Sequence, residues 1–233
     1  MRRILAVCFF IAAFAATSAA STITFNTPAG ANAGGGPVNA SATFTTGAGT
    51  LSVTLTDLQA NPTDVAQLLS DLFFTLSNGS TAGTLTSSSA QEITVNAGGT
   101  FTLGGTVSTG WALSPSGGSL LLNVLGTPIG PAHLIIGPPG GATYSNANGS
   151  IAGNGPHNPF LNQTATFTIT DPSITAATTV TGATFSFGTT AGANVPGTPP
   201  SVPEPATLLL LATGLLVFAI TNGMRKRSAP TRQ

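Results

Sequence analysis

Apolar and hydroxyl residues alternate along several short segments of this 233-residue chain. A period of two residues is typical of a strand that buries one of its faces. The alternation is clearest in residues 51–56, 92–95, 164–169 and 183–187. Further candidates, separated by Gly, Pro or Asn clusters, are residues 22–25, 42–45, 73–76, 100–103, 120–125 and 134–136. The pattern predicts a mainly β domain over residues 21–188, built as an antiparallel sandwich or jelly roll.

Residues 62–73 have a helical rather than a two-residue period. Asn61 can cap such a helix, and Pro62 suits its first position. Four apolar residues then fall on one side, namely Val65, Leu68, Leu69 and Leu72. The segment therefore predicts one short amphipathic helix lying across the sheet. Asp64 and Asp71 would point together from its opposite face. They could form a functional pair of carboxylates, but we favour a solvated helix surface.

Gly, Pro and Asn gather in three stretches of the chain. Residues 127–159 are expected to form long loops around one short strand, and residues 32–39 to form another loop. Residues 189–201, rich in Thr, Gly and Pro, are expected to form a linker.

The N-terminus has the three parts of a secretory signal peptide over residues 1–20. Arg2 and Arg3 precede an apolar core, and small residues follow it, with cleavage expected between Ala20 and Ser21. A twin-arginine signal and a lipid anchor on Cys8 are the disfavoured alternatives. The body is thus expected to be exported.

Residues 206–224 carry no charge, and as a helix they would extend about 28 Å, enough to span a bilayer core of about 30 Å. The basic residues Arg225, Lys226 and Arg227 follow and would stop transfer. The positive-inside rule keeps them in the cytoplasm with the tail at 229–233. The ends together predict a type I inner-membrane precursor with a single transmembrane helix.

Just before this stretch stand Val202, Pro203, Glu204 and Pro205. The two prolines favour extended backbone, which keeps the peptide accessible to a processing enzyme. This motif, the apolar stretch and the basic end, residues 202–228, resemble the PEP-CTERM sorting signal of Gram-negative bacteria. The resemblance implies processing by an exosortase, a membrane-embedded transpeptidase, and delivery to the cell surface or extracellular matrix.

All six Lys and Arg residues lie at the two ends of the chain. Without cationic side chains the body cannot neutralise phosphates, so nucleic acid is not expected as a partner. Removal of the leader also removes Cys8, the chain's one cysteine, which excludes disulfides and a cysteine nucleophile from the mature protein. Stability must come from the core.

Catalytic and metal-binding patterns are weak in this sequence. His133 and His157 lack a nucleophile-elbow motif, and compact zinc or calcium spacing is missing, so we expect no enzyme activity, metal or cofactor. The main hypothesis is a non-enzymatic structural or adhesive protein. A carbohydrate-binding module of the exopolysaccharide matrix, with Trp111 and Tyr144 as ring contacts, is the alternative. A secreted hydrolase using Asp57, Glu92 or Asp171 ranks third.

Overall fold

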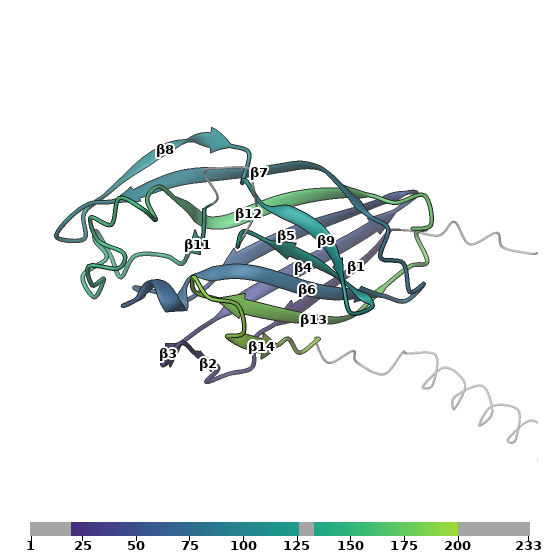
Figure 1. Ribbon diagram of the computed structural model, residues 1–233, viewed down its shortest axis with the longest axis horizontal. Helices are drawn as coiled ribbons and strands as arrows, with labels where there is room; N and C mark the ends of the chain where they lie inside the picture. The colour runs from purple at the N-terminus through teal and green to yellow at the C-terminus, as the bar shows by residue number, and fades with distance from the viewer. Residues whose placement is uncertain (1–19, 126–132, 200–233) are drawn as a thin grey trace, which may run out of the picture. The chain divides into compact units, whose positions relative to one another are not determined.

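The computed structural model describes residues 20–125 and 133–199 (Figure 1). The chain is mainly β, as the sequence predicts. It divides after Pro199 into a unit ending there and a second unit, Pro200–Gln233. The predicted apolar stretches of the leader and of the C-terminal segment lie outside the described residues. Within those residues, no helix has the length and apolar character needed to cross a membrane.

The strands form two groups that are joined by the short strand β11 (Figure 1). The first group follows the order β1 (Ser21–Asn26), β4 (Ala40–Gly47), β5 (Thr50–Asp57), β12 (Phe160–Thr170), β7 (Thr84–Val95) and β8 (Phe101–Val107). The second follows the order β14 (Asn194–Pro196), β13 (Val180–Phe187), β6 (Leu69–Leu76), β10 (Ser119–Asn123) and β9 (Ala112–Ser116). Neighbours within each group are antiparallel, whereas β11 (Ile135–Ile136) runs parallel to β12 and antiparallel to β6.

Aromatic rings from the two groups meet in one core, as expected of a sandwich. Phe44 on β4 lies 5.2 Å from Phe74 on β6, measured between ring centroids. Trp111 lies 5.4 Å from Phe167 on β12. Burying rings of this size supplies much of the stabilisation available to a domain without disulfides.

The hydroxyl residues of the alternating pattern pair across the strands of the first group. Side-chain hydrogen bonds link Thr22 to Thr45, Thr24 to Thr43 and Thr56 to Thr164 at 2.8–3.1 Å. On β5, by contrast, Leu51, Val53 and Leu55 are fully buried. One face is thus apolar and packed while the other is a threonine ladder, which confirms the two-residue period.

The predicted helix over residues 62–73 is wrong. The structure has only a 3-10 turn there, Val65–Gln67, and the strand β6 begins at Leu69. From residue 70 onward the same residues also alternate, with Leu72, Phe74 and Leu76 in the core. Pairing of β6 with both β10 and β13 outweighs a short helix, which is marginal without tertiary support.

The predicted cap and the predicted pair of acids also differ from the structure. Asp64, not Asn61, caps the turn, because its carboxylate accepts a hydrogen bond from the Ala66 N–H at 2.9 Å. Gln67 completes a capping box by accepting from the Asp64 N–H. Asp71 lies on β6 and is buried, so the two carboxylates do not share a helical face.

Part of the segment expected as a linker, residues 189–201, belongs to the sheet. Strand β14 pairs with β13 and buries Val195. Beyond it, Thr198 and Asn26 exchange two backbone hydrogen bonds of 2.8 and 3.0 Å. The ordered fold of the first unit therefore extends about ten residues beyond the expected end at 188.

The loop predictions hold for most of the described residues. Within 133–159 the structure has the one short strand β11, as expected. Residues 32–39, expected as a loop, contain a hairpin of two-residue strands, β2 (Asn32–Ala33) and β3 (Gly36–Pro37). Strand β9 was not expected, because Pro115 and its Ser neighbours resemble loop sequence.

Candidate functional site

The residues expected to direct processing lie mainly outside the described part of the chain. This holds for the motif Val202, Pro203, Glu204 and Pro205 and for the basic residues Arg225, Lys226 and Arg227. At the other end, Ala20 is exposed and Ser21 is the first residue of β1. Cleavage between them would leave β1 whole.

The two aromatic residues expected to contact glycans are buried instead. Trp111 is 3% exposed and its indole N–H donates to the His133 carbonyl at 2.8 Å. Tyr144 is 1% exposed and its hydroxyl donates to the Gly137 carbonyl at 2.9 Å. Neither ring offers a free face to a ligand, because both side chains are packed in the core.

The loop that carries Tyr144 is held close to Gly99. The Gly99 carbonyl accepts from the Tyr144 N–H at 2.8 Å. Gly99 has a φ of +81°, and a Cβ there would lie 2.4 Å from the Tyr144 carbonyl oxygen. Glycine is therefore required at this approach. Burial raises the pKa of Tyr144, and the nearby Asp57 charge adds to the effect.

Three of the carboxylates serve local turns. Asp57, Asp64 and Asp171 each accept a hydrogen bond from the backbone N–H two residues ahead, at 2.8–2.9 Å. Hydrogen bonds from Ala66 and Asn148 lower the pKa of Asp64, and those from Ser80 and Ser173 lower the pKa of Asp171. Asp57 is fully buried, and desolvation raises its pKa well above the usual range.

Glu92 faces an imidazole. Its carboxylate oxygen lies 3.4 Å from His133 Nε2, an ion pair when the imidazole is protonated. His133 is buried and Glu92 is half-buried on β7. Among the described residues, no group of three or more His, Cys, Asp or Glu side chains is placed to hold a metal ion.

Asp71 is the remaining acid, and its environment differs from those above. It is 5% exposed, and its Oδ1 atom has no hydrogen-bond partner in the part of the chain that the structure describes. Asn123, which stands opposite Asp71 in the β10–β6 register, also has a buried side-chain oxygen without a partner. Desolvation raises the pKa of Asp71 to about 6, against the effect of a hydrogen bond from the Val124 backbone.

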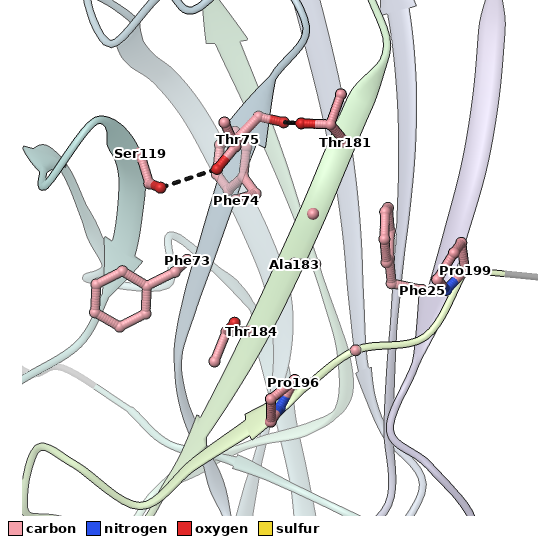
Figure 2. A pocket seen from close by; sticks show the side chains of 12 residues that line it. Phe25, Phe73, Phe74, Thr75, Ser119, Thr181, Ala183, Thr184, Pro196 and Pro199 are labelled. Atoms are coloured by element: carbon pink, nitrogen blue, oxygen red, sulfur yellow. Dashed lines mark hydrogen bonds between the residues drawn. The ribbon is translucent and has the colours of Figure 1, made fainter.

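These two residues begin a surface that we call the Phe73 face. It consists of the side chains that point away from the core on strands β10, β6, β13 and β14. One row across the strands is Asn123, Asp71, Ser186 and Asn194, and the next is Leu121, Phe73, Thr184 and Pro196. Figure 2 shows Phe73, Thr184 and Pro196 following one another across three strands.

Two hollows lie on this face. One, of about 250 Å³, is lined by Asp71, Asn123, Asn194 and apolar side chains that include Leu121 and Leu125. The other, of about 310 Å³, is lined by Thr75, Thr184, Pro196 and Pro199 among others (Figure 2). Phe73 is only partly buried and lines both hollows, which makes them neighbours.

The sequence predicts a strand only from residue 73, because residues 62–73 also fit a helical period, and so it leaves the Phe73 face unassigned. Read as a strand, Asp71, Phe73 and Thr75 form the outward series of β6. The signal available in the sequence was the alternation of an acid and an aromatic residue with Leu72 and Phe74, which are buried.

Comparison with known proteins identifies the C-terminal segment. A model of the PEP-CTERM protein-sorting motif matches residues 201–226. The chain carries a PEP-CTERM sorting motif. The match confirms the resemblance found in the sequence. No curated protein and no solved structure matches the chain.

The PEP-CTERM motif implies export, a C-terminal sorting signal and an exosortase as the processing partner. The motif begins at residue 201, two positions after Pro199, the last described residue. Since β14 and Thr198 are part of the fold, the sorting motif follows the domain almost directly in sequence.

Proposed function

We propose that this protein is a non-enzymatic surface or matrix protein whose β domain is displayed outside the cell. The leader at 1–20 directs export, residues 206–224 hold the precursor in the inner membrane, and an exosortase cuts near Pro203–Pro205. The match of the PEP-CTERM motif to residues 201–226 is the observation that carries the proposal.

The chemistry of the β domain supports a structural role. Asp57, Asp64 and Asp171 stabilise turns, and Glu92 faces a buried imidazole. The threonine ladders, in a sequence without Lys or Arg from residue 4 to 224, give the first group of strands a neutral, hydroxyl-rich face. Such a surface suits contact with hydrated, uncharged polymers more than with nucleic acid or anionic lipid.

Replacement of the motif acid tests the sorting step. We expect Glu204→Ala to leave the protein in the inner-membrane fraction, because the change removes the charge between the two prolines but leaves the apolar stretch intact. Wild-type protein should appear on the surface or in the medium. Cell fractionation with immunoblotting of both forms is the measurement.

Thr190→Ala is the matched control, since Thr190 is exposed and lies outside the motif. It should be sorted as the wild type is. Equal surface amounts of Glu204→Ala and wild type would contradict the proposal, as would retention of the control variant.

A further inference from the structure

Asp71 and Asn123 present two buried oxygen atoms that lack donors among residues 20–125 and 133–199. An unpaired buried acceptor costs about 1–3 kcal/mol, and more when it is charged. The sequence from residue 4 to 224 contains no Lys or Arg to pair with the carboxylate. A bound molecule that carries several hydrogen-bond donors would satisfy both oxygens at once.

The walls beside these oxygens are apolar. Phe73 lies next to Asp71 along the outward series of β6, with Leu121 opposite it on β10. Leu125 lines the same hollow. A molecule that fits must therefore combine donor groups on one edge with an apolar face, as the C–H face and hydroxyl edge of a sugar ring do.

The dimensions fit a chain of small rings. The hollow beside Asp71, about 250 Å³, is smaller than the pockets of about 300–1,000 Å³ that enclose drug-sized ligands. The second hollow continues from Phe73 toward Thr184 and Pro196, with hydroxyls from Thr75 and Ser119 on its border (Figure 2). Neighbouring rings of one polymer could occupy both.

We propose that the Phe73 face binds a neutral polysaccharide. One sugar ring packs on Phe73 and donates hydroxyl hydrogen bonds to the side chains of Asp71 and Asn123, which line the hollow. The next ring lies over Thr184 toward Pro196. This binding site goes beyond the proposed sorting function and does not depend on it.

A calcium ion is the competing ligand for a carboxylate beside an amide oxygen. Calcium takes six to eight oxygen ligands. Here the hollow offers Asp71 and Asn123, while the Asn194 oxygen already accepts from the Ser186 hydroxyl, and the walls are apolar. These contacts favour the sugar.

Binding of oligosaccharides to the full chain tests the site. The probes are soluble neutral oligomers of glucose, mannose, galactose and xylose, titrated calorimetrically in a detergent without a sugar headgroup. We expect at least one to bind, and Phe73→Ala and Asp71→Asn each to weaken that binding about tenfold or more, since the first removes the apolar contact and the second removes the charge of the accepting carboxylate.

Two variants serve as matched controls. Leu103→Ala removes an apolar side chain that is 50% exposed on β8, in the other group of strands. Asp64→Asn neutralises a carboxylate that caps the 3-10 turn, where Asn is an equally good cap. Both should bind as the wild type does. Phe73→Leu replaces Phe73→Ala if the alanine variant has a lowered Tm.

Hydrogen exchange on the wild type gives a readout that needs no variant. Saturating oligosaccharide should slow exchange in residues 69–76 and 119–123. The proposal is overturned if no oligomer binds, if the controls lose affinity equally, or if protection appears only elsewhere. It is also overturned if calcium chloride alone raises the Tm of the wild type but not of Asp71→Asn.

Discussion

Asp57 and Asp71 each hold a carboxyl group away from water, and burial disfavours their ionised forms. Asp71 accepts a hydrogen bond from the Val124 backbone, yet its Oδ1 has no partner among the described residues. Asp57 accepts a hydrogen bond from the Gln59 N–H, yet the effect of desolvation on its pKa is larger. Natural domains retain such costs where the group has a use, and at Asp71 the polysaccharide site provides one.

The raised pKa values of these acids set the pH dependence of stability. The pKa of Asp71 is about 6 in the folded chain against 3.8 in the reference state, so the folded state binds the proton more tightly. The contribution of Asp71 to the free energy of unfolding is fully present below pH 4 and is lost as the pH rises through 6. The loss is about 3 kcal/mol, at ~1.4 kcal/mol per pKa unit. Asp57 acts in the same direction.

The lowered pKa values of Asp64 and Asp171 act in the opposite direction, because their contribution is lost as the pH falls below about 4. We therefore expect the free energy of unfolding to be higher at pH 5 than at pH 7. Urea denaturation of the full chain at both pH values measures it, and Asp71→Asn should reduce the difference. Equal or greater stability of the wild type at pH 7 would contradict this account.

At the scale of elements, most strands were predictable because one face of each is buried. The first half of strand β6 was an exception, since Leu68, Leu69 and Leu72 satisfy a helical stripe as well as a sheet, whereas residues 73–76 are predicted as a strand. Pairing with β10 and β13, which are far away in sequence, favours the strand over the helix. Strand β14 was missed because three residues are too few to show a period.

The residues of the candidate site could not be predicted either, because their burial depends on contacts between distant parts of the sequence. Trp111 and Tyr144 drew attention as the chain's single Trp and Tyr, but residue type does not reveal burial. Their hydrogen bonds run to backbone carbonyls of His133 and Gly137, contacts set by the tertiary fold. Phe73, one Phe among 13, lies where the predicted helix 62–73 and the predicted strand 73–76 meet, so its outward direction follows only once β6 is known to begin at Leu69.

Strand β14 provides a test of where the domain ends. Val195 is 7% exposed, so Val195→Ala should lower the free energy of unfolding by about 1–3 kcal/mol through lost burial. The exposed Thr190, in the same segment, should tolerate alanine within about 0.5 kcal/mol. Chemical denaturation of both variants is the measurement. No loss for Val195→Ala would mean that the segment is a linker after all.

At the scale of the whole molecule, the parts have separate tasks. The β domain is held together by one aromatic and aliphatic core. Its sequence lacks cysteine after residue 8, so folding outside the cytoplasm needs no disulfide formation. The PEP-CTERM motif at residues 201–226 specifies sorting and begins three residues after Thr198, which makes the last backbone contact that the structure describes.

The intact mass of the protein isolated from the cell surface or medium tests this account most directly. It should correspond to a chain that begins at Ser21 and ends near Pro203–Pro205, with any added group attached at that new end. A surface protein whose mass still includes residues 206–233 would contradict exosortase processing and with it the central claim.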